Sequence, residues 1–215
     1  MSNLEKNVEA VLSLISERVD SGDRFMIAIA GPPGSGKSTL AEAVVECLNQ
    51  ASGKADLVPV DGYHLDVEML EQMGLLARRG APDTFDAMGF LDMLQRARQG
   101  SSDIEYPVFD RARDCAIKNA RRLSVDTDIV VVEGNYLLLD APVWRELRSL
   151  FDVSVFLQPS MNTLEDRLLQ RWLSLGFSRE QAANKVYGND LKNAQRVLAE
   201  SVAADLTLGE ETVAR

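Results

Sequence analysis

A glycine-rich segment, residues 31–39, constrains this chain more than any other part of its sequence. It reads GPPGSGKST and fits the pattern G-x-x-x-x-G-K-[ST]. The apolar run Phe25–Ala30 precedes it, as in a strand buried on both faces, and apolar residues at helical spacing follow from Leu40. Glycines allow successive backbone N–H groups to point inward beside a helix start, so the segment predicts a phosphate-binding loop.

The same loop predicts how a nucleotide and its metal bind. Lys37 would reach the β- and γ-phosphates of ATP, and the Ser38 hydroxyl would hold Mg²⁺. A second apolar run, residues 129–133, ends in Glu133, whose carboxylate would face the same Mg²⁺ through water. The predicted nucleotide ligands are Gly31, Gly34, Ser35, Gly36, Lys37, Ser38 and Thr39.

Short apolar runs alternate with helical patterns five times along the chain. This alternation predicts an α/β domain, with helices on both faces of a mostly parallel sheet. We expect one domain over residues 1–215, in which the non-periodic stretches 61–86 and 101–122 are loops that hold ligands. The expected strands are residues 25–30, 55–60, 129–133, 153–157 and, more weakly, 204–208.

Composition and charge exclude several functions. The chain has 23 Lys+Arg against 33 Asp+Glu, a net charge of -10, which disfavours a non-specific nucleic-acid binder. Two cysteines and one histidine are too few for a disulfide framework or a Cys/His zinc site, so we expect a cytoplasmic protein. Neither a signal-peptide pattern nor an apolar run of about 18 residues occurs, so no membrane partner is expected.

Missing motifs and the chain length exclude some classes of nucleotide-binding protein. A guanine-specific GTPase needs the motif N-K-x-D, but residues 184–187 read NKVY and lack the Asp. Oligomeric motor ATPases usually need a longer chain. Small-molecule kinases remain, and their acceptor sites are built from the loops between the other strands.

Six stretches of this sequence together resemble one kinase family. They are residues 31–39 (GPPGSGKST), 59–66 (PVDGYHLD), 78–86 (RRGAPDTFD), 106–114 (YPVFDRARD), 130–139 (VVVEGNYLLL) and 188–194 (GNDLKNA). Over nearly its whole length the chain resembles the P-loop kinases grouped with uridine kinase, phosphoribulokinase and bacterial pantothenate kinase. It is most similar to the bacterial branch named as fructose transport system kinases. The resemblance implies a P-loop NTPase fold: a three-layer sandwich with a five-stranded parallel sheet in the order 2-3-1-4-5, and a helical lid.

The resemblance also implies an acceptor site. It places at Asp61 the carboxylate that orients the acceptor hydroxyl or takes its proton, and a carboxylate after a strand can do this. The alternative is that Asp61 only opens a turn with Gly62. Tyr63 and His64 would line the acceptor pocket by the same analogy. The motifs offer an aromatic wall with carboxylates, which suits a sugar or polyol, at Phe85, Asp86, Tyr106, Phe109 and Asp110. Arg113 is a candidate for binding a phosphate or carboxylate of the acceptor, with a paired surface ion as the alternative. Asn135 and Tyr136 directly follow Glu133 and are further candidate acceptor contacts.

Two arginines are candidates for stabilising the transferred phosphoryl group. Arg167 and Arg171 are four residues apart, so they share a helix face. In related kinases a lid supplies arginines that fold over the phosphates, which implies a catalytic role beside Lys37 and Asp61. The sequence RLLQRWLSLGFS departs from the better-known lid pattern, so the acting arginine and the alternative of solvent-facing charges both stay open.

We therefore expect an ATP- and Mg²⁺-dependent kinase that phosphorylates a hydroxyl of a small-molecule sugar or polyol, with fructose as the specific guess. A nucleoside or pantothenate-like alcohol is the alternative acceptor. From another class, a nucleotide-binding regulator associated with transport stays open, and protein phosphorylation is disfavoured because H-R-D and D-F-G motifs are missing. Relatives of this sort are often homodimers, which leaves a homodimer open.

Overall fold

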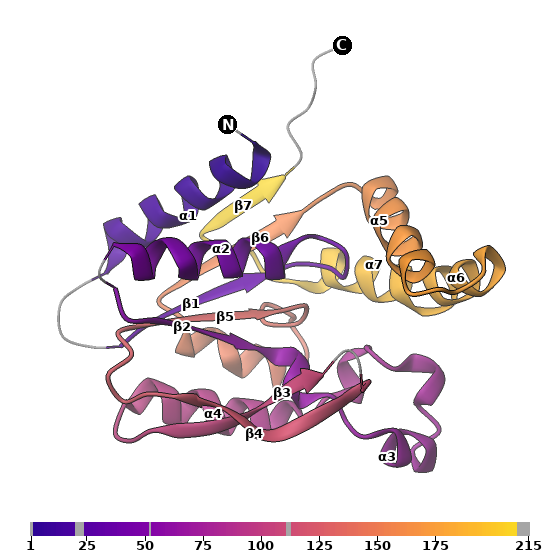
Figure 1. Cartoon of the computed structure of the whole chain (residues 1–215), viewed down its shortest axis with the longest axis horizontal. Coiled ribbons are helices and arrows are strands. Elements are labelled where there is room, and N and C mark those ends of the chain that lie inside the picture. Colours follow the sequence, from indigo (N-terminus) through magenta and orange to yellow (C-terminus); the bar gives the residue numbers. More distant parts are fainter. Residues whose placement is uncertain (1, 20–23, 52, 111–112, 210–215) are drawn as a thin grey trace.

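A five-stranded parallel sheet forms the centre of the protein (Figure 1). The structure is a computed structural model that describes residues 2–19, 24–51, 53–110 and 113–209. The strands run in the spatial order β2-β5-β1-β6-β7. Counted along the chain, the strands of this sheet lie in the order 2-3-1-4-5, so the expected order is confirmed. The strands are β1 (Phe25–Ala30), β2 (Ala55–Pro59), β5 (Ile129–Gly134), β6 (Val153–Gln158) and β7 (Leu206–Gly209).

Helices cover both faces of this sheet and make three layers (Figure 1). Alternate residues of β1 enter different cores, as Met26 and Ile27 illustrate. The core containing Ile27 is completed by α1 (Asn3–Arg18) and α2 (Lys37–Gln50). On the other face the core includes α4 (Ala87–Gln99) and the 3₁₀ helix Trp144–Leu150. The predicted three-layer sandwich is therefore confirmed, because β1 is buried on both sides.

Three helices form the predicted lid beyond the carboxyl end of β6. They are α5 (Met161–Ser174), α6 (Arg179–Lys185) and α7 (Leu191–Glu200), and a π-helical turn, Val186–Asp190, joins the last two. These helices share a small hydrophobic core made of Leu164, Leu168, Val186, Leu191 and Ala194. Ser178 and Gln181 form a capping box at the start of α6. Within the described part of the chain, no helix is long and apolar enough to cross a membrane.

The two stretches expected to be loops contain regular structure, so that expectation was wrong. Residues 101–122 fall largely within an antiparallel hairpin of β3 (Ile104–Asp110) and β4 (Cys115–Leu123). The register shifts between Tyr106 and Val108, at a proline, and most of β4 is exposed, so neither strand shows regular alternation. Residues 61–86 contain α3 (Val67–Gln72) and several short 3₁₀ turns.

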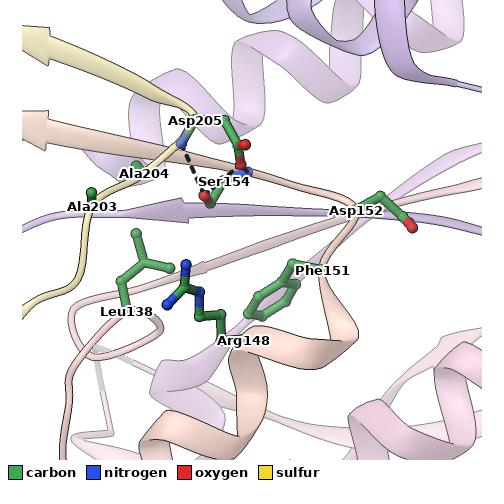
Figure 2. Close-up of a pocket in the computed structure, with 8 residues that line it drawn as sticks. All are labelled: Leu138, Arg148, Phe151, Asp152, Ser154, Ala203, Ala204 and Asp205. Atoms are coloured by element: carbon green, nitrogen blue, oxygen red, sulfur yellow. Dashed lines mark hydrogen bonds between the residues drawn. The ribbon is translucent and has the colours of Figure 1, made fainter.

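A surface cavity of about 260 Å³ lies at the amino-terminal ends of β6 and β7 (Figure 2). Its lining includes Ser154 near the start of β6 and Asp205 just before β7. The Asp205 carboxylate accepts hydrogen bonds from the backbone N–H and the hydroxyl of Ser154, both at 2.8 Å. In a parallel sheet these ends lie away from residues 31–39, which follow the carboxyl end of β1. The cavity is therefore separate from the predicted phosphate-binding loop.

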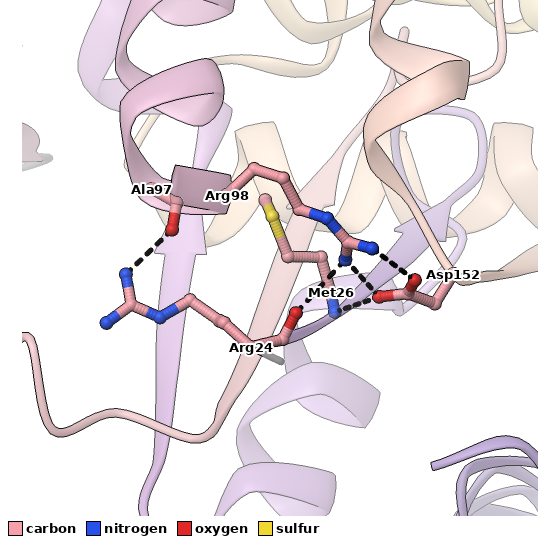
Figure 3. A network of polar contacts seen from close by, with 5 residues as sticks. All are labelled: Arg24, Met26, Ala97, Arg98 and Asp152. Carbon is pink, nitrogen blue, oxygen red and sulfur yellow. Dashed lines mark hydrogen bonds and ion pairs between the residues drawn. The ribbon is translucent and has the colours of Figure 1, made fainter. Parts of the chain in front are cut away.

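Two arginines form hydrogen bonds and an ion pair at this amino-terminal end of the sheet (Figure 3). Arg24 is 8% exposed and donates to four backbone carbonyls, including that of Ala97 in the last turn of α4 at 2.8 Å. Arg98 pairs with Asp152, which also accepts a hydrogen bond from the Met26 N–H at 2.7 Å. These contacts satisfy helix-end carbonyls and tie α4 to the starts of β1 and β6. The strand that leads into the phosphate-binding loop is thus held at its far end.

Candidate active site

The loop after β1 has the backbone conformation of an anion cradle. Gly34 and Gly36 have φ values of +82° and +93°, which L-residues with side chains rarely adopt. Gly36 is the N-cap of α2 and gives no side-chain cap, so the first N–H groups of a long helix can bind an anion. The Ser35 hydroxyl is buried and has no hydrogen-bond partner among the described residues. This geometry fits the phosphate groups of a nucleotide.

Ser38 and Glu133 meet at the start of α2. The Ser38 hydroxyl donates to Glu133 Oε1 at 3.2 Å, and Glu133 is 4% exposed. Glu133 reaches this position because β5 pairs with β1, with Glu133 opposite Ile29. Within the described residues there is no group of three or more His, Cys, Asp or Glu that could hold a metal unaided. A hydroxyl beside one carboxylate nevertheless fits Mg²⁺, which commonly takes its other ligands from substrate phosphates and water.

Asp61 lies at the same edge of the sheet as Glu133. It follows β2 in the 3₁₀ turn Val60–Tyr63, and the last residue of β2, Pro59, pairs with Glu133. The side chain of Asp61 is half-buried. Its carbonyl oxygen accepts a hydrogen bond from the backbone N–H of His64 at 3.2 Å, so Asp61 also takes part in a turn. Adjacent parallel strands therefore bring the two carboxylates to the side of the sheet where the phosphate-binding loop begins.

His64 is held in one orientation and one tautomer. Its Nδ1 lies 2.8 Å from the Asp61 carbonyl oxygen, and because a carbonyl only accepts, Nδ1 must carry the proton. Burial lowers the pKa of His64, an effect that Arg79 reinforces and that Asp61 and Asp114 oppose. The ring is consequently neutral near pH 7, which leaves Nε2 as a hydrogen-bond acceptor.

This lowered pKa predicts a pH-dependent stability. Below the ordinary pKa of 6.5, the unfolded chain binds a proton on its single histidine before the folded chain does. The free energy of unfolding should therefore fall as the pH falls from about 7 to about 5.5, by at most about 1.4 kcal/mol per pH unit. Urea unfolding of the wild type and His64→Asn at both pH values measures this. An equal pH dependence in the two proteins would contradict the assignment.

Two aromatic rings pack against His64, and an arginine packs against one of these rings. The rings of Phe85 and Phe109 lie 4.1 Å and 5.0 Å from the His64 ring, centroid to centroid. The Arg79 guanidinium lies 5.6 Å from the centroid of Phe109 and pairs with Asp114 at 2.5 Å. We call His64, Phe109 and Arg79 the acceptor wall. Arg79 belongs to the RRGAPDTFD motif, but its sequence position alone does not indicate that it would stack on a ring from the hairpin.

Four residues predicted to contact the acceptor also have structural roles. Tyr106 is 1% exposed and donates its hydroxyl to the Leu57 carbonyl at 3.0 Å. Tyr136 is fully buried and donates to the Gly80 carbonyl, while Tyr63 packs within the core. Asp86 caps α4 by accepting a hydrogen bond from the Gly89 N–H at 2.9 Å. The hydroxyls of Tyr106 and Tyr136 are therefore occupied by backbone carbonyls, whereas Asp86 is exposed and uses one carboxylate oxygen as the cap.

Three other predicted contacts lie near the ends of the hairpin and of β5. Arg113 is exposed, and its backbone N–H donates to the Asp110 carboxylate at 3.1 Å, within one turn of the hairpin. The side chains of Arg113 and Asp110 also approach to 3.5 Å. Asn135 follows Glu133 by two positions, and its buried Oδ1 has no hydrogen-bond partner among the described residues. Asn135 therefore has a polar atom available at the carboxyl end of β5, whereas Arg113 is engaged locally.

The two lid arginines differ in position. Arg167 Nη1 donates to the carbonyls of Gly34 and Ser35 at 3.2 Å and 3.1 Å, so it already contacts the phosphate-binding loop. Arg171 is exposed and lies near Asp190, whose pKa is raised by burial and lowered less strongly by Trp172 and Arg171. Trp172 is half-buried and donates its indole N–H to Asp190 at 2.6 Å. Of the two arginines, Arg167 is the one that contacts the loop.

Comparison with known proteins agrees with this geometry. The model of the phosphoribulokinase/uridine kinase family matches residues 26–189. A crystal structure from Silicibacter sp. TM1040, named "putative fructose transport system kinase", is 42% identical, with a TM-score of 0.89 over 97% of this chain and 99% of that one. "Uncharacterized protein YggC" of Escherichia coli is 32% identical over 96% of this chain and 86% of its own length. A "putative uridine kinase" of Schizosaccharomyces pombe is 30% identical over 86% and 83% of the two chains.

The chain therefore belongs to the phosphoribulokinase/uridine kinase family. It is a P-loop kinase, a phosphotransferase that uses an alcohol group of a small molecule as acceptor.

Proposed function

We propose that this kinase transfers the γ-phosphoryl group of ATP to a hydroxyl of a sugar or polyol, with fructose as the specific candidate. The observation that carries the proposal is the position of Asp61, which follows the strand that pairs with β5 at Glu133 and whose carbonyl is bonded to the His64 ring of the acceptor wall. Aromatic rings suit the apolar face of a sugar, while the neutral His64 can accept a hydrogen bond from a hydroxyl. The name of the Silicibacter structure supports fructose in particular.

The residues of the site divide the reaction between them. The N–H groups of the loop and Lys37 bind the phosphates of ATP, and Asp61 aligns the acceptor hydroxyl and takes its proton late in the transfer. Ser38 and Glu133 would hold Mg²⁺, which when bound neutralises charge on the phosphate oxygens. Arg167, with Arg171 as the second candidate, offsets negative charge as the phosphoryl group moves. The closed lid keeps water from the nucleotide, which limits idle hydrolysis of ATP.

The kinase has a proposed domain organisation, cellular compartment and set of partners. We infer that residues 1–215 act as one P-loop kinase domain in the cytoplasm, where ATP and small sugars are available. Its partner is the small-molecule acceptor, with no part for nucleic acid or membrane, and a homodimer is compatible with this function.

The proposal is tested by ADP release from Mg·ATP with a panel of acceptors: fructose, other hexoses, ribulose 5-phosphate, uridine, pantothenate and glycerate. We expect a sugar or polyol to stimulate the rate into the range of about 1–100 s⁻¹. Asp61→Asn should lower the stimulated rate by about 10²-fold, because the hydroxyl loses its aligning base. Asp83→Asn is the control and should retain the wild-type rate, because Asp83 is exposed in the same segment, residues 61–86.

The other outcomes separate the alternatives. Stimulation by uridine or pantothenate alone would replace the sugar with a nucleoside or a pantothenate-like alcohol. If no compound raises the rate above background while ATP still binds, a nucleotide-binding regulator is favoured over the kinase activity proposed here. Equal stimulated rates in Asp61→Asn and the wild type would remove Asp61 from the reaction.

A further inference from the structure

The lid and the acceptor side of the molecule are joined by two asparagines of the GNDLKNA segment. Asn189 donates its amide to the backbone carbonyl of Arg79 at 2.7 Å, although the two residues are 110 positions apart. Asn193 is 3% exposed and accepts a hydrogen bond from the Arg78 guanidinium at 3.2 Å. The Asn193 amide donates in turn to Asn189 Oδ1 at 3.4 Å. Nothing in the proposed reaction yet uses these contacts.

These bonds also settle the orientation of the Asn189 side chain. Its NH₂ group faces a carbonyl, and its Oδ1 faces the NH₂ group of Asn193. The reverse orientation would set oxygen against oxygen on one side and NH₂ against NH₂ on the other. The NH₂ group of Asn189 is therefore the donor that holds the Arg79 backbone.

A π-helical turn presents Asn189 to the acceptor side. Val186–Asp190 is π-helical, a rare conformation that often occurs at functional sites. The next residue, Asp190, accepts the indole N–H of Trp172, which anchors the turn to α5. Helix α5 also carries Arg167, which contacts the phosphate-binding loop. The turn is thus fixed to the lid on one side and reaches residues 78–79 on the other.

A continuous series of contacts then leads from Asn189 to Asp61. The Arg79 guanidinium stacks on Phe109, 5.6 Å from the ring centroid, and the Phe109 and His64 centroids are 5.0 Å apart. The His64 ring is hydrogen-bonded to the Asp61 carbonyl at 2.8 Å. A shift of the Arg79 backbone would therefore move the guanidinium that covers Phe109 and loosen the acceptor wall.

We propose that Asn189 is a positioning residue for the acceptor: its amide ties the backbone of Arg79, and with it the acceptor wall, to the lid. This inference rests on the proposed function in one respect only, namely that the acceptor binds at this wall. Its consequence is selective, because the predicted nucleotide ligands belong to the loop after β1, whereas Asn189 is bonded to residue 79. Loss of the Asn189 donor should weaken acceptor binding while ATP binding is preserved.

The test is the nearly isosteric variant Asn189→Asp, which places a carboxylate oxygen where the donor was. We expect the KM for the stimulating acceptor to rise about tenfold, as one hydrogen bond is lost, while the KM for ATP stays within about twofold. Asn184→Asp, on the exposed face of α6, is the matched control and should change neither KM. Equal rises in both KM values would overturn the proposal, since they indicate general damage to the lid.

A second variant and a second measurement keep the test independent of the acceptor. Arg79→Ala removes the stack on Phe109, so combining it with Asn189→Asp should give less than the product of the two single effects. Hydrogen exchange of the amides in residues 76–80 and 104–110 should accelerate in Asn189→Asp but not in Asn184→Asp. This readout stands even if no panel compound is phosphorylated, and unchanged exchange in both segments would overturn the positioning role.

Discussion

Lys37→Ala is expected to lower kcat by about 10³-fold or more, the largest loss of activity that we predict for a single side chain. Lys37 is the first residue of α2, directly after the left-handed Gly36, so its position relative to the loop is set by the backbone. Its ammonium group is the cation of the loop that can reach the β- and γ-phosphates. Removing it leaves the helix start and the loop N–H groups to bind ATP without that charge.

The measurement is ADP release at saturating ATP and acceptor, together with calorimetric titration of a non-hydrolysable ATP analogue. We expect the affinity for the analogue to fall by no more than about tenfold, because the backbone cradle persists. Lys54→Ala, at an exposed lysine before β2, serves as the control and should behave as the wild type. Full activity of Lys37→Ala would show that residues 31–39 do not act as the catalytic phosphate-binding loop.

Gly62→Ala is expected to disrupt the acceptor side of the molecule. A Cβ at position 62 would lie 2.1 Å from the carbonyl oxygen of Pro107 and 2.6 Å from its carbonyl carbon. Both are backbone atoms of β3, so no side-chain rotation can relieve the overlap. The hairpin must move by about 1 Å or the turn containing Asp61 must, and a misplacement of that size can cost about 10²-fold in rate.

Both activity and stability report this displacement. We expect kcat/KM for the acceptor to fall by more than about 10²-fold, and the free energy of unfolding by about 1–3 kcal/mol, as for other overpacked sites. Gly209→Ala is the matched control, because a Cβ there meets only the carbonyl oxygen of Gln158, at an ordinary contact distance of 3.9 Å. Wild-type stability and activity in Gly62→Ala would mean that the turn and β3 are not in this close contact.

The Asp-Gly pair at residues 61–62 illustrates what a sequence motif can and cannot say. A glycine after an aspartate is typical of a turn, and the turn is present, with Asp61 accepting a hydrogen bond from His64. The glycine itself is required for a different reason, the approach of Pro107 from a hairpin more than forty residues later in the sequence. That requirement depends on a tertiary contact, which no local pattern encodes.

The residues of the aromatic motifs divide in the same way. Four aromatic residues were expected at the acceptor because they lie in the motifs that carry the family resemblance: Phe85, Tyr106, Phe109 and Tyr136. Tyr106 and Tyr136 are buried with their hydroxyls bonded to backbone carbonyls, whereas Phe109 stacks between His64 and Arg79. Arg79 and Asn189 lie in two of the motifs, but their contacts were not predicted, because each acquires its position from a partner distant in sequence.

The local chemistry of this protein follows from short segments of its sequence. Residues 31–39 specify a phosphate-binding loop, and the apolar runs specify the parallel sheet, because backbone conformation and burial periodicity depend on neighbouring residues. Tertiary contacts determine where the hairpin packs against the Asp61 turn and how Asn189 joins the lid to Arg79. Burial and hydrogen-bond partners depend on segments that are distant in the sequence and come into contact only in the folded chain. A local sequence pattern therefore does not predict them.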